Sequence, residues 1–259
     1  MMTEKFSSLG IENGIATVTL MRAERMNALH PAAHYELEGI FDALARDATL
    51  RAVIITGAGK AFCTGYDLKD NLETGKIDLP GSGFGGLTFR EDYRLPLIAA
   101  VNGAALGGGF ELALACDLIV AAQGALFALP EPKVGWAALG GGVQRLPRAI
   151  GTKRAMSMIL TGRSVDAAEG ERLGFVNQVV PGAELLAAAN AWAAQIAECA
   201  PLAIRCSKQV AYASFDQPSF AAMMDLASYS TAAALFESED AAEGKRAFAQ
   251  RRKPNWRGR

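Results

Sequence analysis

The stretch AALGGGFELALACD, residues 104–117, combines two costly features in a run of Ala, Leu, Phe and Cys. Its three consecutive glycines, Gly107–Gly109, each lose backbone entropy on ordering. Its lone carboxylate, Glu111, is in an apolar setting, where an ionised group needs a partner or a function. A predicted strand precedes the glycines and a predicted helix follows them. This order predicts a turn at which the backbone can approach a ligand closely.

The N–H groups at the start of the predicted helix are suited to hold an oxyanion. They have no intrahelical partner and carry the positive end of the helix dipole. A second glycine turn, AFCTGYDL (61–68), also follows a predicted strand, so a second N–H could face the first. Two donors converging on one oxygen would stabilise an enolate beside Glu111. Close backbone packing explains the three glycines equally well, and the residues alone leave both interpretations open.

Strands alternate with helices up to about residue 180, which predicts an α/β core. Asn13-Gly14 between two alternating stretches predicts a hairpin, and Pro31 opens a predicted helix over 31–47. Short apolar runs predict buried strands at 51–57, at 95–103 and on both sides of Gln123-Gly124. From residues 185–200 onward the pattern is helical only, with one helix expected over FAAMMDLASYSTAAALFES (220–238).

Composition excludes several classes of protein. The 259 residues carry a formal net charge of −1, which argues against wholesale nucleic-acid binding. No apolar run reaches the ~18 residues of a membrane span, and the N-terminal residues do not resemble a signal peptide. The four cysteines show no metal-binding spacing and, without an export signal, indicate reduced thiols in a cytoplasmic protein.

Three weaker motifs have a plain interpretation beside a functional one. GSGFGG (81–86) fits G-x-G-x-x-G, but no strand precedes it and no clear helix follows, so we expect a flexible loop. It lies in a long Gly-rich segment, 70–94, which we interpret as a loop near a ligand. His30 and His34 could share a metal, yet no third ligand is near and an exposed helix face is expected.

The basic stretch 245–259 holds seven Lys or Arg in fifteen residues. It could bind nucleic acid, be solvated, or meet the phosphates of a small anionic ligand. Composition alone favours the solvated interpretation.

Several motifs in the same order make the chain resemble the crotonase (enoyl-CoA hydratase/isomerase) superfamily along nearly its full length. They are MRAERMNAL (21–29), AFCTGYDL (61–68), PLIAAVNGAALGGGFELALACDLIVAA (96–122), FALPEPKVG (127–135), GGVQRLPRAIG (141–151) and AFAQRRKPNW (247–256). The chain is most similar to the carnitinyl-CoA dehydratase branch and its hydratase relatives in GFGGLT (83–88), FALPE and the C-terminal stretch.

The resemblance assigns a role to each feature of the opening stretch. It gives the oxyanion hole to the N–H groups of Tyr66 and Gly108, and the two catalytic carboxylates to Glu111 and Glu131. Family hydratases use such a pair to activate water and to exchange a proton at the α-carbon. Isomerases of the family commonly keep only one of the two acids. The resemblance therefore implies reversible hydration of an enoyl-CoA thioester.

The resemblance also implies where coenzyme A lies, as part of the substrate and with no separate cofactor and no metal. Its backbone contacts fall on Glu24, Arg25, Met26, Thr64, Gly65, Asp67 and Leu68. Lys253 and the other basic C-terminal residues would meet its phosphates, in the same or a neighbouring subunit. Glu24 stands where the family frequently has Lys, and Tyr66 where many members have a small residue.

The fold implied by the resemblance is an α/β spiral of ββα units followed by a helical trimerisation region. We expect the spiral core, with the CoA and acyl site, over 1–199 and the oligomerisation region over 200–259. A homotrimer, or a hexamer formed as a dimer of trimers, is the implied assembly, with no nucleic acid or membrane partner.

Other functions remain open from the sequence alone. A Δ3,Δ2-enoyl-CoA isomerase, or a hydratase-lyase that goes on to cleave a carbon–carbon bond, would use the same fold. A non-catalytic oligomer that binds CoA or RNA is a different class. The pair Glu111 and Glu131 favours catalysis, because a binding module has no need for two acids at an oxyanion hole.

Overall fold

The hairpin predicted at Asn13-Gly14 begins the larger of two sheets. The structure, a computed structural model, describes residues 5–69, 72 and 77–259. Strands β1 (Ser7–Glu12) and β2 (Ile15–Leu20) pair antiparallel, and the two turn residues have φ of 51° and 75°. Positive φ at both positions is what a two-residue hairpin turn requires, so this prediction is confirmed.

Two sheets share the remaining strands. The six-stranded sheet has the order β1-β2-β3-β5-β7-β10, and every pair after the hairpin is parallel. The four-stranded sheet has the order β4-β6-β8-β9. The remaining bounds are β3 (Ala52–Gly57), β4 (Ala61–Cys63), β5 (Leu97–Val101), β6 (Ala104–Leu106), β7 (Leu118–Ala122), β8 (Leu126–Ala128), β9 (Val165–Asp166) and β10 (Gln178–Val180). A long strand of the first sheet is followed three times by a short strand of the second, which makes successive turns of a spiral.

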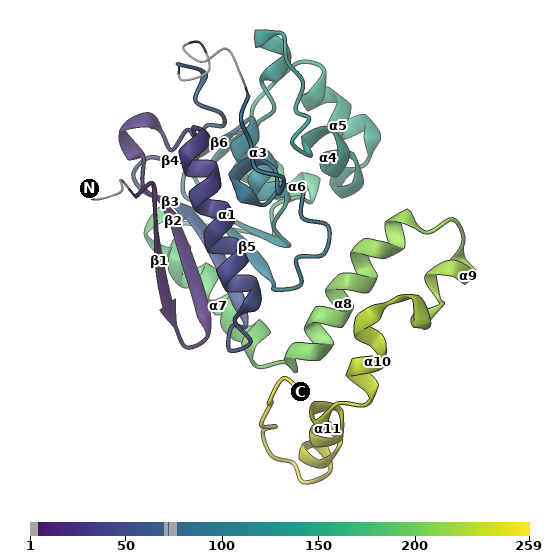
Figure 1. Ribbon diagram of the computed structural model, residues 1–259. Coiled ribbons are helices and arrows are strands. Elements are labelled where there is room, and N and C mark those ends of the chain that lie inside the picture. The colour runs from purple at the N-terminus through teal and green to yellow at the C-terminus, as the bar shows by residue number, and fades with distance from the viewer. Residues whose placement is uncertain (1–4, 70–71, 73–76) are drawn as a thin grey trace.

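Helices cover both faces of the larger sheet (Figure 1). Val53 and Ile55 of β3 face the cluster that includes α1 (Pro31–Arg46), whereas Ala52 and Ile54 face α7 (Leu185–Ala197). Alternate residues of a strand point to opposite faces, so a run that is apolar throughout predicts burial on both sides. The other core helices are α3 (Gly108–Leu114), α4 (Gly142–Ile150), α5 (Thr152–Ile159) and α6 (Ala167–Leu173).

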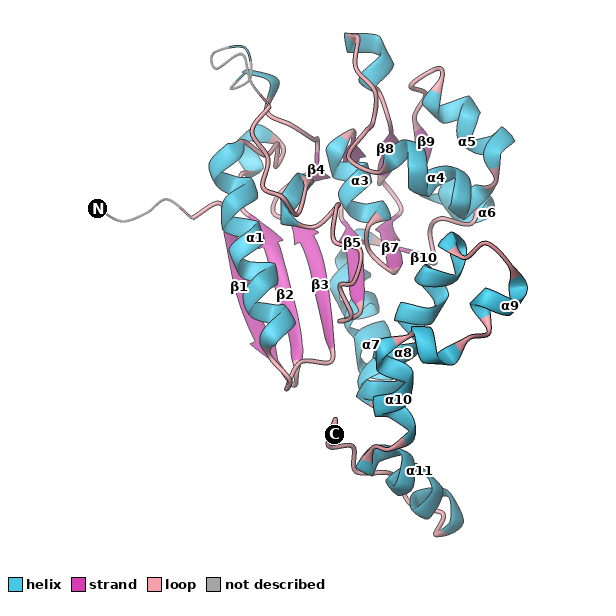
Figure 2. Cartoon of the chain, turned by 45° about the vertical axis from the view of Figure 1, so that its right-hand side comes forward, coloured by secondary structure: helices cyan, strands magenta, loops and turns pink. Residues whose placement is uncertain are grey.

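The C-terminal helices extend away from this core (Figure 2). They are α8 (Pro201–Ala213), α9 (Phe220–Met223), α10 (Ser230–Phe236) and α11 (Glu239–Ala249). The single helix expected over 220–238 is wrong. Asp225 accepts a hydrogen bond from Ala227 N, a short 3-10 turn follows over Leu226–Ser228, and Tyr229 is extended. A local side-chain bond of this kind competes with the helix ladder.

The division expected at 199/200 falls between α7, which packs on the larger sheet, and α8. Lys208 of α8 reaches back to the core, where its Nζ lies 2.7 Å from Asp117 Oδ2 and donates to Leu95 O at 2.9 Å. Asp117 also accepts from Leu97 N, at the start of β5. Whether the two parts behave as separate domains stays a prediction.

Across the described ranges of the chain, no helix combines the length and the apolar character that a membrane span requires. The 3-10 turns that bear on the site are η1 (Ala23–Arg25), η2 (Phe84–Gly86) and η3 (Glu131–Val134).

Candidate active site

The two glycine turns lie against each other at the end of the smaller sheet. Parallel pairing of β4 with β6 brings Gly65 beside Gly108, which begins α3. A Cβ added at Gly65 would lie 3.2 Å from Gly108 N and 3.0 Å from Leu106 O. Gly65 also has φ of 96°, so both sterics and conformation favour glycine there. This approach brings together the two turns that the sequence predicted to face each other.

The backbone direction at Tyr66 follows from its neighbours. Leu29 N donates to Gly65 O and Asp67 N donates to Leu29 O, each at 2.9 Å. In a strand-like segment successive N–H groups point to opposite sides. The N–H of Tyr66 therefore points away from Leu29.

Glu111 is in the first turn of α3 and is 4% exposed. Its Oε1 accepts a hydrogen bond from Gly142 N at 2.9 Å, at the start of α4. A Cβ added at Gly140 would lie only 2.4 Å from Oε2, so the glycines of 140–142 leave room for the carboxylate. Burial, and then the charge of Glu131, raise the pKa of Glu111 to about 7, against the lowering effect of the Gly142 bond.

Glu131 approaches the same glycine turn from η3. A Cβ added at Gly107 would lie 3.0 Å from Glu131 Oε1. Its Oε2 is buried and has no hydrogen-bond partner among the described residues, and burial raises the pKa of this group. Pro130 and Pro132 flank Glu131, and prolines on both sides of a residue favour an extended chain. The structure departs from this local preference, since Pro130 has ψ of 3° and Glu131 begins a 3-10 turn.

The arrangement places two acids with raised pKa beside a pair of glycine turns that present backbone N–H groups. A carboxyl group with a pKa near 7 exists in both protonation states at neutral pH, so it can accept and donate a proton. Buried oxygens without a protein partner occur at sites that act on water or ligand. Such a site can polarise a carbonyl oxygen and move protons next to it.

The residues expected to contact coenzyme A form two adjacent segments. Thr64 donates to Met26 O at 3.2 Å through both N and Oγ1, which holds the segments side by side. Glu24, Arg25, Met26 and Leu68 are exposed, and Thr64 is partly so. The side chain of Asp67 is used within the fold, because its Oδ2 lies 3.1 Å from Arg22 Nη2.

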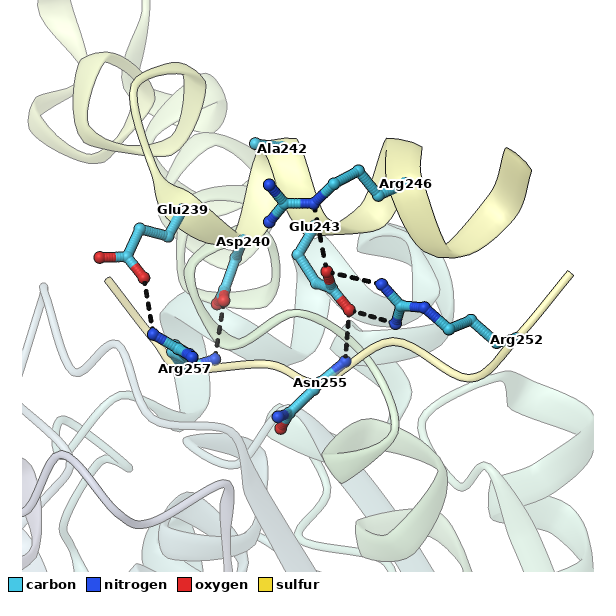
Figure 3. Close-up of a pocket in the computed structure, with 8 residues that line it drawn as sticks. All are labelled: Glu239, Asp240, Ala242, Glu243, Arg246, Arg252, Asn255 and Arg257. Atoms are coloured by element: carbon cyan, nitrogen blue, oxygen red, sulfur yellow. Dashed lines mark hydrogen bonds and ion pairs between the residues drawn. The ribbon is translucent and has the colours of Figure 1, made fainter. Parts of the chain in front are cut away.

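The structure does not bring Lys253 to this site within the chain. The C-terminal segment lies with α11, at the other end of the molecule from β4 and α3 (Figures 1 and 2). Much of its charge is neutralised there, since Glu243 pairs with Arg252 and Arg246, and Glu239 pairs with Arg257 (Figure 3). These residues line a cavity of about 540 Å³. The phosphate-binding role expected for this stretch stays a prediction.

The GSGFGG segment is not the flexible loop that we expected. Residues 83–88 are buried, and Gly83, Gly85 and Gly86 have positive φ. A Cβ added at Gly108 would lie 2.6 Å from Phe84 Cε2, so this segment packs directly on the start of α3. Residues 83–88 of the expected loop therefore lie beside the candidate site, and the contact of this loop with a ligand stays a prediction. Residues 70, 71 and 73–76 lie outside the described residues.

His34 is another residue that the sequence placed wrongly. We expected an exposed helix face, but its side chain is fully buried, in contact with Tyr66 and Phe84. Among the described residues no group of three or more His, Cys, Asp or Glu could hold a metal ion. Arg145 was also missed: its Nη2 donates to Thr88 O at 2.7 Å and thus ties α4 to the 83–88 segment.

Comparisons with known proteins identify the family of the chain. The model of the enoyl-CoA hydratase/isomerase family matches residues 10–259. The chain is 41% identical over 243 residues to the carnitinyl-CoA dehydratase of Proteus mirabilis, covering 91% of this chain and 92% of that protein. It is 42% identical over 250 residues to the carnitinyl-CoA dehydratase of Escherichia coli K12, covering 95% of each.

Solved structures of enoyl-CoA hydratases have the same fold as the chain. The chain superposes on an enoyl-CoA hydratase from Mycobacterium tuberculosis with a TM-score of 0.92 at 39% identity, over 99% of this chain and all of that one. The corresponding values for an enoyl-CoA hydratase from Mycobacterium marinum are 0.92 and 38%, with the same coverage. The predicted α/β spiral is confirmed, and the chain belongs to the enoyl-CoA hydratase/isomerase family of enzymes.

Proposed function

We propose that this protein is an enoyl-CoA hydratase that reversibly adds water across the α,β double bond of an acyl-CoA thioester. The observation that carries the proposal is the pair Glu111 and Glu131, both with raised pKa, of which Glu131 acts electrostatically on Glu111 and lies against the glycine turn that leads into the helix of Glu111. An isomerisation needs one group to move a proton. Hydration must also hold and activate a water, which gives a second acid a function.

In this proposal the N–H groups of Tyr66 and Gly108 hold the thioester oxygen. As water adds to the β-carbon, negative charge develops on that oxygen and an enolate forms. Two fixed donors stabilise this charge more than they stabilise the neutral carbonyl, and this difference accelerates the reaction. The close approach of Gly65 to Gly108 N is what supports a shared oxygen position.

Glu111 and Glu131 share the proton transfers. The ionised carboxylate accepts a proton from water while the oxygen attacks, and the α-carbon receives a proton from the acidic partner. The pKa of Glu111, raised to about 7, suits a group that must change protonation state at neutral pH. Because water and protons are the only co-reactants, the proposal includes coenzyme A as part of the substrate and no separate cofactor.

Coenzyme A is proposed to lie along the exposed edge formed by residues 24–26 and 64–68, which ends at the Gly65 turn. The acyl group then extends past the turn toward the acids. The C-terminal helices carry several large apolar side chains with high exposure, among them Phe236 at 72% and Phe248 at 88%. We propose that they form contacts between subunits in a homotrimer or a dimer of trimers.

The test is hydration of crotonyl-CoA, followed as loss of the absorbance of the conjugated thioester. We expect Glu111→Gln and Glu131→Gln each to lower kcat by roughly 10²–10⁴, since each keeps the shape of the side chain and removes proton transfer. The double variant should be little worse than the poorer single one, because the two acids act as a unit. The matched control is Glu12→Gln, on the exposed end of β1.

Two outcomes would redirect the proposal. If Glu111→Gln loses hydration yet still moves a β,γ double bond into conjugation, the protein is an isomerase. If the wild-type protein hydrates no enoyl-CoA of any length, the hydratase proposal is wrong.

A further inference from the structure

His34 is a buried polar side chain to which the proposed chemistry assigns no function. It lies on the first turn of α1 and is fully buried. Its Nδ1 accepts a hydrogen bond from Gly85 N at 2.9 Å. A neutral imidazole that accepts at one nitrogen carries its proton on the other, so Nε2 is a donor. That donor has no hydrogen-bond partner among the described residues.

The position of His34 connects this donor to the candidate site. Its ring stacks on Tyr66 at 5.6 Å between centroids and meets Phe84 edge-on at 4.6 Å. Tyr66 supplies one proposed oxyanion donor, and the ring of Phe84 packs on Gly108, which supplies the other. His34 therefore contacts the side chain of one residue proposed to supply an oxyanion donor and the ring that packs on the other, which places its unpaired N–H next to the candidate site.

We infer that His34 is a specificity-determining residue whose Nε2–H donates a hydrogen bond to a neutral oxygen on the acyl chain. This inference rests on the proposed function, and it adds the substrate class: an enoyl-CoA whose acyl group bears a hydroxyl or keto oxygen beyond the double bond. A buried N–H left without an acceptor costs free energy, and a site with such a donor discriminates against acyl groups that lack the acceptor.

The charges nearby select a neutral oxygen over a carboxylate or a cation. Burial is the main cause that lowers the pKa of His34 to about 3, so the ring is neutral at physiological pH and attracts no anion by charge. The carboxylate of Asp78 acts on His34 electrostatically, Glu131 lies against Gly107, and Glu111 is in the first turn of the helix that follows. A carboxylate on the acyl group would be repelled by these acids. A quaternary ammonium group could not accept the Nε2–H bond at all.

Two substitutions of His34 test the roles of its two ring nitrogens separately. In His34→Asn the amide oxygen can take the place of Nδ1 and keep the Gly85 bond, while the distal donor is lost. In His34→Gln the amide nitrogen can reach the place of Nε2 and keep the donor. The matched control is His30→Asn, one turn earlier, where His30 caps α1 by accepting from Ala33 N and asparagine is an equally good cap.

The readout is the ratio of kcat/KM for 4-, 5- and 6-hydroxy-2-hexenoyl-CoA to that for 2-hexenoyl-CoA, with a 2-hexenoyl-CoA that ends in a carboxylate as a further arm. We expect the wild type to prefer at least one hydroxy isomer by about tenfold, and the carboxylate to be the poorest substrate. His34→Asn should reduce the preference about tenfold, whereas His34→Gln and His30→Asn should retain most of it. A merely structural role would lower kcat/KM on all substrates alike and leave the ratio unchanged.

A measurement on the wild-type protein tests the inference even if a variant fails to fold. The chain has two histidines, so ¹⁵N-labelled histidine gives two sets of ring signals that His30→Asn assigns. A saturated hydroxyhexanoyl-CoA should shift the Nε2–H proton of His34 downfield, and hexanoyl-CoA should not. Equal shifts, or hydration of hexenoyl-CoA with no preference, overturn the inference and leave the proposed function intact. No hydration of any enoyl-CoA overturns the proposed function instead.

Discussion

The spiral core and the C-terminal helices are stabilised in different ways. In the core, strand residues pack on both sheet faces, and glycines let backbone touch backbone. Among the C-terminal helices, the cluster of buried apolar residues consists of Cys206, Tyr229 and Ala232. Ion pairs hold α11 to the segment that follows it, and several aromatic rings are exposed. A region that buries little apolar surface of its own depends on neighbours. The glycine turns and the two acids of the candidate site lie in the core, which buries its own apolar surface.

The sharpest test of this difference is the same substitution in each part. A Cβ added at Gly109 of α3 would lie 1.9 Å from Cys63 O, whereas one at Gly244 of α11 would meet the Trp256 ring at 3.3 Å. We expect Gly109→Ala to lower the free energy of unfolding by about 3 kcal/mol or more, because backbone cannot move aside cheaply. Gly244→Ala should change it by less than about 1 kcal/mol, since alanine favours the helix. Urea denaturation of both variants measures this; equal losses would contradict the comparison.

A second test uses the buried acid of the core. The folded protein holds the pKa of Glu111 at about 7, above its usual 4.5, so it binds more protons than the unfolded chain between these pH values. The contribution of Glu111 to stability therefore falls as pH rises from 4.5 to 7, by about 3 kcal/mol in all. In Glu111→Gln this pH dependence should be absent. The free energy of unfolding of the variant, relative to that of the wild type, should therefore be higher at pH 8 than at pH 4.5. Denaturant titrations of both proteins at the two pH values measure this difference. If the free energies of unfolding of the two proteins change equally with pH, Glu111 has an ordinary pKa.

The connection between the two parts can be tested at Lys208. Its side chain and that of Asp117 are 13% and 19% exposed, so Lys208→Met leaves a largely buried carboxylate without its cation. We expect a loss of about 2 kcal/mol. The control is Arg148→Met, whose pair with Asp216 also joins the two parts but is 54% and 71% exposed. Solvent screening should reduce its effect to less than about 1 kcal/mol. A larger loss at Arg148 than at Lys208, in thermal unfolding, would reverse this order.

The smallest effect on folding is expected at the exposed rings of the C-terminal helices. Phe236→Ser and Phe248→Ser remove side chains that contact little within the chain, so the free energy of unfolding of one chain should change by less than about 0.5 kcal/mol. The mass of the assembly should fall instead. Sedimentation velocity of the double variant checks this, and an assembly as large as the wild type would exclude these rings from subunit contacts.

The sequence predicted the core best where local chemistry and burial agree. Asn13-Gly14 fixes its hairpin through backbone conformation alone, and the apolar run of β3 suits only a strand covered on both faces. The turn at Gly107–Gly109 was predicted because strand, glycines and helix follow one another directly along the chain. The rarity of an acid in such a run made Glu111 a candidate, and the structure shows that its side chain is buried beside Gly142.

What the sequence did not predict depends on distant partners. Glu131 enters a 3-10 turn although two prolines favour an extended chain around it, and no local signal shows that choice. His34 and the 83–88 segment look exposed along the chain, yet in the structure both are buried and pack on each other. Arg145 matters for its bond to Thr88, fifty-seven positions earlier in the chain. Such pairings are set by the tertiary structure.

Asp240 on α11 makes the packing of this helix depend on residues that follow it in the chain. Its carboxylate is 1% exposed and accepts hydrogen bonds from Arg257 N at 2.7 Å and Gly258 N at 2.9 Å. A buried carboxylate without such donors costs free energy, so α11 packs stably only when residues 257 and 258 lie against it. Proteolytic trimming before Arg257 would therefore loosen α11 and leave the core and its candidate site unaffected.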